Sequence, residues 1–484
     1  MRMLFKRYGA VTEMLNTAGQ YNPIVFARFE GRNLSPARKR ILFYGHYDVI
    51  AAENEQKKWM DDPFKMYPLN GYIYGRGASD NKGPVLAALY AAGELLRQHT
   101  LGADVVFLIE GEEECGSRGF EDAVRTYKDI IGEIDYIVLA NSYWLDDEVP
   151  CLTYGLRGVI HATVTVDSDH PDLHSGVDGS SLLDESLKDL VMLLARLTGP
   201  NGRVEIPSFY DPILEVTEAE KDRYVAITST LLRRNPALGD RETLTASLMQ
   251  RWREASLTIH RFKVSGPEHS TIIPRRACAA ISLRLVPSQE ASVVKQSLVA
   301  FLEACFAELG TKNHLSVKID HEADPWLGDP ENAIYQILEE AIVAVWGSTV
   351  ASSLAYQPPT PPSKAIGQPP SPATSSTLSH APGFIPSASL PPPSYPTAQD
   401  ISHPAVHSSE RKRRPFKPLY IREGGSIPSI RFLEKEFNAP AAHLPCGQAS
   451  DSAHLDNERL RLVNLYKSRE IFKRVFGMGM AGNV

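Results

Sequence analysis

The chain is poor in cysteine and has no long apolar run. Its 484 residues include five cysteines, which are Cys115, Cys151, Cys278, Cys305 and Cys446. Their number is odd and they form no CxxC pair, so they suggest neither a disulfide framework nor a thiolate zinc site. No stretch of about 18 apolar residues occurs, and the first residues lack the apolar core of a signal peptide. We therefore expect a cytoplasmic protein that does not enter a membrane.

An excess of positive charge is also missing. The formal net charge is −7, with 23% charged residues. Such a chain has no overall basic field that would draw it to nucleic acid or to anionic lipid. Its 43% of apolar residues suffice for a large core and for two domains. Small, water-soluble substrates fit this composition better than nucleic acid or membrane.

Three apolar runs are each followed by polar or acidic residues. They are ILFYGHYDVI at 41–50, VVFLIE at 105–110 and YIVLA at 136–140, and each is typical of a buried strand. Between the first two, NKGPVLAALYAAGELLRQ has helical periodicity, with Pro84 suited to a first turn. Strands that alternate with helices predict an α/β fold whose mostly parallel sheet has helices on both faces.

The pattern changes from about Gly158. HATVTV alternates like a half-exposed strand and precedes the helix-like LLDESLKDLVMLLARL, and a strand, helix, strand order follows in AAISLRLV, SVVKQSLVAFLEACFAEL and LSVKID. We predict a smaller α+β, ferredoxin-like lid and dimerisation domain over residues 158–322. It is inserted between the two parts of the catalytic domain, 1–157 and 323–484.

A proline-rich segment interrupts the second part. Residues 351–400 contain 13 of the 35 prolines, among many Ser, Thr and Ala. This composition cannot bury enough apolar surface to become ordered, which predicts a disordered insertion at about 351–415. The basic run at 411–414 closes it, and we interpret that run as a solvated flank rather than a localisation or partner signal.

Candidates for chemistry follow the predicted strand ends. They are His46, Asp48, Asp80, Glu113, Glu114, Asn141 and His454. The carboxyl ends of parallel strands face one crevice, so residues scattered in sequence can cluster in space. His46 and Asp48 are two apart and point to the same side, which lets the carboxylate bond one imidazole nitrogen while the other binds metal. In EGEEE, one carboxylate can be a ligand and the next a free base.

Each of these signals is weak alone, but their order is specific. GHYDV, GRGASDNKGP, EGEEECGS and DSAH resemble the motifs of the M20 family of metallopeptidases. The resemblance implies two divalent ions, zinc or manganese, with Asp80 bridging them. It implies His46 on the first ion, Glu114 and His454 on the second, Asp48 as the carboxylate that orients His46, and Glu113 as general base.

Further motifs concern the substrate. DLHSG is similar to the motif whose histidine, here His174, reaches the active site of a partner subunit, which implies a homodimer. Arg284 in SLRLVP, with Gly425 and Ser426 in REGGSIP, matches positions that hold the substrate's terminal carboxylate. A carboxylate anchor beside the reacting bond favours short peptides.

One position departs from the family pattern. The remaining ligand of the first metal is acidic in the family, and LANSYW places Asn141 there. A neutral amide oxygen can coordinate zinc or manganese, but it lacks the charge that makes carboxylate binding strong. The sequence therefore predicts a weaker first metal site beside a complete second one.

The segment NSYWLDDEVPCLTYGLRG is similar to one branch of the family, the peptidase-like subunit of a fungal glutathione-degrading complex. This resemblance implies hydrolysis of a di- or tripeptide, with the γ-glutamyl bond of glutathione as a candidate, and a glutamine-amidotransferase-like partner subunit. Three alternatives stay open: an N-acyl amino acid deacylase, a carboxypeptidase, and a non-catalytic scaffold with a degraded metal site.

Three other residues are assigned no chemical role. Cys115 and Cys446 lie beside ligand motifs without a base signature, and we interpret both as small packing residues. His161 is interpreted as an ordinary strand residue.

Overall fold

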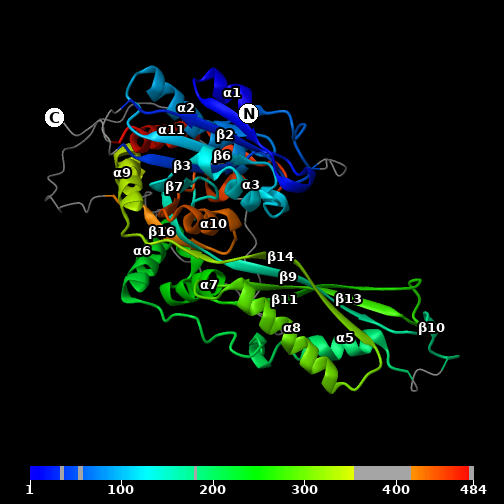
Figure 1. Ribbon diagram of the computed structural model, residues 1–484. Helices are drawn as coiled ribbons and strands as arrows, with labels where there is room; N and C mark the ends of the chain where they lie inside the picture. The colour runs from blue at the N-terminus through cyan, green and yellow to red at the C-terminus, as the bar shows by residue number, and fades with distance from the viewer. Residues whose placement is uncertain (33–37, 53–57, 179–182, 354–415, 479–484) are drawn as a thin grey trace, which may run out of the picture. The chain divides into compact units, whose positions relative to one another are not determined.

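The computed structural model describes residues 1–32, 38–52, 58–178, 183–353 and 416–478 (Figure 1). Residues 1–346 and 417–484 form one compact unit, to which the following description applies. Most of the predicted insertion at 351–415 lies outside the described residues, although 351–353 complete helix α9 (Ala333–Ser353). No helix in the described ranges is long and apolar enough to cross a membrane.

A nine-stranded sheet forms the centre of the catalytic part, in the order β1-β2-β6-β3-β7-β17-β8-β15 with β16 also paired to β8. Its strands are β1 (Val11–Leu15), β2 (Ile24–Phe29), β3 (Arg40–His46), β6 (Asp104–Glu110), β7 (Tyr136–Leu139), β8 (Cys151–Leu156), β15 (Trp326–Leu327), β16 (Leu419–Glu423) and β17 (Ala441–His443). The central strands β6, β3, β7 and β17 are parallel, which confirms the predicted parallel sheet. Strands β1 and β2 pair antiparallel, since the link between them is too short for a crossover.

Helices cover both faces of this sheet, as predicted. Helices α2 (Gly83–Arg97) and α11 (Leu462–Phe476) lie on one face, and α3 (Phe120–Thr126) and α10 (Pro428–Phe437) on the other (Figure 1). Phe43 and Tyr44 are neighbours on β3 and point to opposite faces. The Phe43 ring centroid lies 5.5 Å from that of Phe472 on α11, and the Tyr44 centroid lies 5.5 Å from that of Phe120 on α3.

The lid has its own sheet, in the order β11-β13-β9-β14 and antiparallel throughout. The strands are β9 (Gly158–Asp167), β11 (Ser256–Val264), β13 (Arg276–Leu285) and β14 (His314–Ala323), and helices α5 (Ser186–Ala195) and α8 (Ala291–Glu308) cover one face. Strand, helix, two strands, helix and strand in this order make the predicted ferredoxin-like fold. The domain boundaries at 158 and 322 stay a prediction.

Several elements had no clear sequence signal. Helices α6 (Glu218–Arg234) and α7 (Arg241–Arg253) lie between α5 and β11 in the chain and pack against β16. The buried carboxylate of Glu220 on α6 lies 3.0 Å from Arg422 Nη2 on β16 and 3.2 Å from Arg253 Nε. Small sheets also join β18 (Arg459–Arg461), β5 (Tyr72–Tyr74) and β4 (Tyr67–Leu69), and pair β10 (Leu173–His174) with β12 (Ile272–Ile273). The other α-helices in the described ranges are the short α1 (Arg2–Arg7) and α4 (Lys128–Ile131).

Candidate metal centre

The candidate ligands gather at the carboxyl edge of the central strands. His46 is the last residue of β3, Asn141 follows β7, and the segment after β6 carries Glu113 and Glu114. Because these strands are parallel, all three ends lie on one edge. The loop before α2 and the loop before β18 add the other ligands to this edge, which are Asp80 and His454.

His46 lies between two carboxylates. Its side chain is fully buried, with Nε2 3.0 Å from Asp80 Oδ1 and Nδ1 3.3 Å from Asp48 Oδ1. Asp48 Oδ2 also accepts a hydrogen bond from the backbone N–H of Glu114 at 2.9 Å. The structure therefore places Asp48 where it can fix the orientation of the imidazole and of the acidic loop together.

Asp80 connects the two halves of the site. Its Oδ1 faces His46, and its Oδ2 lies 3.1 Å from His454 Nε2. His454 Nε2 is also 3.1 Å from Glu114 Oε2. The arrangement matches a bridging carboxylate with one group of ligands on each side.

Asn141 lies at the first half of the site but offers little to a metal. Its Nδ2 is 3.5 Å from His46 Nε2, and its Oδ1 accepts a hydrogen bond from the Ser142 backbone N–H at 2.6 Å. Its backbone oxygen accepts one from His443 Nε2 at 2.8 Å. One of the two lone pairs of the amide oxygen is thus engaged by the next residue in the chain.

The donors fit a divalent metal ion. One donor atom from each of His46, Asp80 and Glu114 lies within 4.8 Å of the others. Imidazole nitrogen with carboxylate oxygen is a donor set of zinc and manganese sites. Hydrogen bonds to Asp80 and Glu114 raise the pKa of His454 to about 10. The protonated imidazole is thus the positive charge that lies between these two carboxylates, where a metal ion would also be favoured.

Glu113 lies next to the cluster of His46, Asp80 and Glu114 but makes no hydrogen bond to it. Its Oε2 is 3.9 Å from His46 Nε2. Burial raises the pKa of Glu113 to about 8, and the charges of Asp80, Glu110 and Glu114 add to the shift while His46 opposes it. A carboxyl group with a pKa near neutrality can both accept and return a proton.

Glu458 organises the loop that carries Asp80, and sequence reasoning missed it. This fully buried carboxylate accepts hydrogen bonds from Arg76 Nη1 at 2.8 Å and from the backbone N–H groups of Gly77, Ser79 and Asp80 at 2.9, 2.9 and 3.0 Å. Gly77 has a φ of +82°, and a Cβ there would lie 2.6 Å from Lys82 Nζ, so this turn needs glycine. The sequence signal that could have pointed to Glu458 is its place four positions after His454, in the segment of the last ligand motif.

The predicted substrate residues come from other elements than the candidate ligands. Arg284 is partly buried on β13, and among the described residues no carboxylate pairs with it. Gly425 faces open space and accepts a hydrogen bond from the Arg157 backbone N–H at 3.0 Å, and Ser426 is half-buried beside it. His174 is exposed on β10, at the end of the lid that is distant from the central sheet (Figure 1). The chain does not bring His174 to its own metal centre.

The two cysteines beside the ligand motifs differ. Cys446 is buried, as expected for a packing residue, whereas Cys115 is exposed. The interpretation of Cys115 as a packing residue is therefore wrong, since the loop after Glu114 turns its side chain to solvent.

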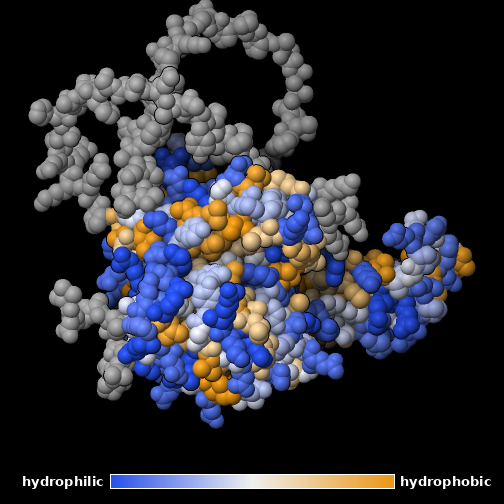
Figure 2. Space-filling view, turned by 90° about the horizontal axis from the view of Figure 1, so that it is seen from above, coloured by the Kyte–Doolittle hydropathy of each residue, from blue (hydrophilic) through white to orange (hydrophobic). Residues whose placement is uncertain are grey.

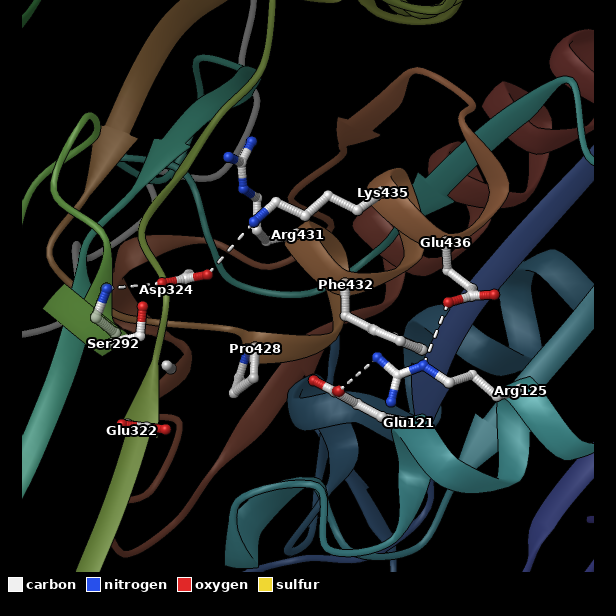
Figure 3. Close-up of a pocket in the computed structure, with 12 residues that line it drawn as sticks. Glu121, Arg125, Ser292, Glu322, Asp324, Pro428, Arg431, Phe432, Lys435 and Glu436 are labelled. Atoms are coloured by element: carbon white, nitrogen blue, oxygen red, sulfur yellow. Dashed lines mark hydrogen bonds and ion pairs between the residues drawn. The ribbon is translucent and has the colours of Figure 1, made fainter. Parts of the chain in front are cut away.

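A cavity of about 360 Å³ lies elsewhere, between α3, α10, the start of α8 and the end of β14 (Figure 3). Its cations are already paired. Arg125 is 3.2 Å from Glu121 and 3.4 Å from Glu436, and Lys435 is 3.6 Å from Asp324. None of the predicted site residues lines it, so the metal centre is the stronger candidate for catalysis.

Known proteins resemble this chain along most of its length. It is 38% identical over 483 residues to the "Probable di- and tripeptidase DUG2" of Saccharomyces cerevisiae, covering 98% of this chain and 46% of that protein. It is 34% identical to the "Beta-Ala-His dipeptidase" of Homo sapiens, covering 94% of this chain and 77% of that protein. The solved structure of human carnosine dipeptidase 1 matches with a TM-score of 0.68 and 26% identity, over 98% of this chain and 88% of that one.

The chain thus spans about half the length of its yeast relative. Residues 42–361 match the family described as "Peptidase family M20/M25/M40". This match covers more than half of the 484 residues. The human dipeptidase is also similar to this chain over most of the length of both proteins. The chain belongs to peptidase family M20/M25/M40.

Proposed function

We propose that this chain hydrolyses an amide bond in a di- or tripeptide with the help of two divalent metal ions, zinc or manganese. The observation that supports this best is Glu113, a buried carboxyl group with a pKa of about 8, beside the cluster of His46, Asp80 and Glu114. A base near neutral pKa next to a metal-binding set is the combination that amide hydrolysis requires.

The residues divide between two ions. His46 and Asp80 would hold the first, with Asn141 as a weak third ligand, and Asp80, Glu114 and His454 would hold the second. When bound, such ions lower the pKa of water from about 15.7 toward about 7 and polarise a carbonyl group.

Glu113 moves the proton. Its carboxylate takes one from the attacking water as the carbon–oxygen bond forms, and then gives it to the departing amine as the carbon–nitrogen bond breaks. Proton transfer by a positioned side chain contributes about 10²–10⁴ in rate. Asp48 keeps His46 oriented and takes no part in the transfer.

Arg284, Gly425 and Ser426 hold the terminal carboxylate of the substrate. The guanidinium is partly buried and without a carboxylate partner in the described part of the chain, and Gly425 leaves space beside Ser426. An anchor for a free terminus selects short peptides, because the reacting bond must lie close to that terminus.

The enzyme works as a homodimer in which His174 completes the active site of the partner. Two features support this. His174 is exposed and distant from its own metal centre (Figure 1), and the edge strand β11 exposes Ile259, Phe262 and Val264. An exposed, apolar edge strand is a template for pairing with a second chain.

Glutathione is the tripeptide that we propose for this site, with its γ-glutamyl bond cleaved in the cytoplasm together with a glutamine-amidotransferase-like partner subunit. The support is the 38% identity to a relative named as a di- and tripeptidase, together with the segment from Asn141 to Gly158 that resembles the glutathione-degrading branch.

One experiment tests these proposals together. Metal content of the purified chain is measured, followed by hydrolysis of Cys-Gly, glutathione and an N-acyl amino acid, with added zinc or manganese and with Glu113→Gln as the inactive control. Hydrolysis of the peptides alone supports a peptidase. Preference for the N-acyl amino acid would favour a deacylase, and a metal-free chain that is inert even with the candidate partner would leave a scaffold.

A further inference from the structure

The helical hairpin of α6 and α7 packs against β16 (Figure 1). This strand leads directly into residues 424–426, which are called the substrate loop below because they contain Gly425 and Ser426. The ring centroids of Tyr224 on α6 and Trp252 on α7 lie 6.0 Å apart, so the two helices are packed as one unit. Neither helix carries a residue that the proposed mechanism uses.

A buried carboxylate on α6 joins the hairpin to β16. Glu220 is 3% exposed, with its Oε1 3.0 Å from Arg422 Nη2 and its Oε2 3.2 Å from Arg253 Nε at the end of α7. The Arg422 guanidinium also lies 5.2 Å from the ring centroid of Tyr154 on β8. Because Arg422 is two residues before Gly424, Glu220 holds the end of the strand that carries the substrate loop.

The end of α7 also contacts the substrate loop itself. A Cβ on Gly424 would lie 3.1 Å from the backbone oxygen of Arg251. Arg157 Nη1 donates a hydrogen bond to the backbone oxygen of Glu254, directly after α7, at 3.3 Å. Arg157 donates to the loop as well, from Nε to the Gly424 oxygen at 3.2 Å and from its backbone N–H to the Gly425 oxygen at 3.0 Å. The loop therefore lies between Arg157 and the end of α7.

One carboxylate serves two arginines in this arrangement. In the described part of the chain, Glu220 is the carboxylate that pairs with Arg422 and with Arg253. Its removal would leave two largely buried guanidinium groups without a partner, which strongly favours a rearrangement of the segments that carry them. One of these segments continues into the substrate loop.

We propose that the α6–α7 hairpin positions the substrate loop and that Glu220 is the positioning residue, so that substrate affinity depends on a side chain buried outside the site. The inference rests on the proposed function, which assigns Gly425 and Ser426 to the terminal carboxylate of the substrate. Glu113 and the candidate metal ligands lie on other segments. A displaced loop weakens binding in the ground state and the transition state alike, which raises KM and leaves kcat unchanged.

The test compares Glu220→Gln with the parent chain in two measurements. Hydrogen–deuterium exchange should become faster in a peptide that covers residues 419–428 and stay the same in one that covers 40–48. KM for Cys-Gly should rise about tenfold, with kcat changed by less than about twofold. Glu218→Gln is the matched control on the same helix, since Glu218 is an exposed carboxylate 2.7 Å from Lys221 Nζ, and it should change neither measurement.

Gly424→Ala tests the same contact without removing a charge. Its methyl group would lie 3.1 Å from both the Arg251 backbone oxygen and Arg157 Nη2, which pushes the loop away from α7. Exchange in 419–428 and KM should therefore rise here too. This variant decides the question if Glu220→Gln does not fold.

The exchange measurement separates this inference from the proposed function. If the parent chain hydrolyses no dipeptide, the proposed function fails, while faster exchange confined to 419–428 still supports the positioning of the loop by Glu220. If dipeptides are hydrolysed and both variants leave exchange and KM unchanged, the inference is overturned and the peptidase activity stands. Faster exchange in both peptides, or a fall in kcat at constant KM, overturns it as well, because Glu220 would then have a general structural role.

Discussion

Two groups at the candidate metal centre hold protons when no metal ion is bound. Hydrogen bonds to two carboxylates raise the pKa of His454 to about 10, and burial raises that of Glu113 to about 8. Both groups are therefore protonated at pH 7 when no metal is bound. A metal ligand and a general base must be deprotonated, so metal binding has to displace these protons.

We predict that zinc releases protons when it is titrated into the chelator-treated protein at pH 7. The release should be smaller at pH 9, because Glu113 has then already lost its proton while His454 still holds one. Calorimetry in buffers of different ionisation enthalpy measures it, and Glu113→Gln should lower the release at pH 7. A release that does not change between these two pH values would contradict the assignment.

The substitution Asn141→Asp should strengthen the first metal site. It adds a negative charge beside His46, and we expect about tenfold tighter binding or more, the scale of a charge-assisted contact. Metal content per chain and dipeptide hydrolysis are the measurements, with Asn141→Ala as the control that adds no charge. Unchanged metal content in Asn141→Asp would show that Asn141 does not limit this site.

Apart from His46, which ends β3, the candidate ligands lie outside the named strands and α-helices, and buried carboxylates hold two of these segments in place. Glu458 directly precedes β18 and binds three successive parts of the loop before α2. Asp451 plays a similar part before His454, accepting a hydrogen bond from the Gln448 backbone N–H at 2.9 Å. The positions of Asp80 and His454 thus depend on segments that carry no ligand.

Replacing Glu458 by Gln should both destabilise the protein and weaken metal binding. Arg76 would lose its buried partner, at a cost of about 3 kcal/mol in the free energy of unfolding. Urea unfolding and metal affinity test this prediction. The control is Glu470→Gln, which removes a surface carboxylate that pairs with Arg469 and Lys473 and should change stability by less than about 1 kcal/mol. Equal effects of the two substitutions would contradict the role of Glu458.

Asp451 should make the free energy of unfolding depend on pH. Burial raises the pKa of Asp451 to about 8 from an ordinary value of 3.8, so the folded chain keeps this proton over a range in which the unfolded chain has lost it. The contribution of Asp451 to the free energy of unfolding is fully present below about pH 4. It falls by up to about 1.4 kcal/mol per pH unit as the pH rises to 8. Asp451→Asn has no proton to lose and should flatten the dependence in urea unfolding at pH 5 and pH 8. A parent-like slope would contradict this.

Helix and strand prediction succeeded where apolar periodicity was strong. Helices α2 and α8 and strands β3, β6 and β9 lie close to the predicted segments, since each has a buried face that repeats along the chain. Helices α6 and α7 were missed because their buried faces are small, limited on α6 to Glu220, Tyr224, Ile227 and Thr228 and on α7 to Leu248 and Trp252. Tertiary contacts with β16, not local pattern, place them.

At the scale of the whole molecule, the lid separates His174 from the metal centre of its own chain. Figure 2 shows mainly hydrophilic residues on the distal part of the lid, with hydrophobic ones near its end, and Val177 beside His174 is 78% exposed. A site completed by a partner would make activity depend on assembly, as closed two-fold dimers permit.

Mixing two inactive variants tests this arrangement. A dimer of one Glu113→Gln chain and one His174→Ala chain keeps one complete site if His174 acts across the interface. Half of randomly mixed dimers are of this kind, so about a quarter of the parent activity should return. Sedimentation first establishes that each variant is folded and dimeric. No recovery in mixed dimers would place His174 outside the partner's site.

The sequence by itself determined the types and order of the candidate ligands. His46, Asp80, Glu114 and His454 follow strand ends or stand in motifs, and these are local properties of a chain that a parallel sheet brings to one edge. Only the tertiary structure decided which carboxylates hold the candidate ligands in place. Glu458 reaches the backbone of Asp80 across 378 residues, and Asp48 reaches that of Glu114 across 66. The side-by-side placement of His260, His161 and His321 in the lid sheet likewise depends on the register of separate strands. Periodicity along one strand cannot show what lies beside it on the next.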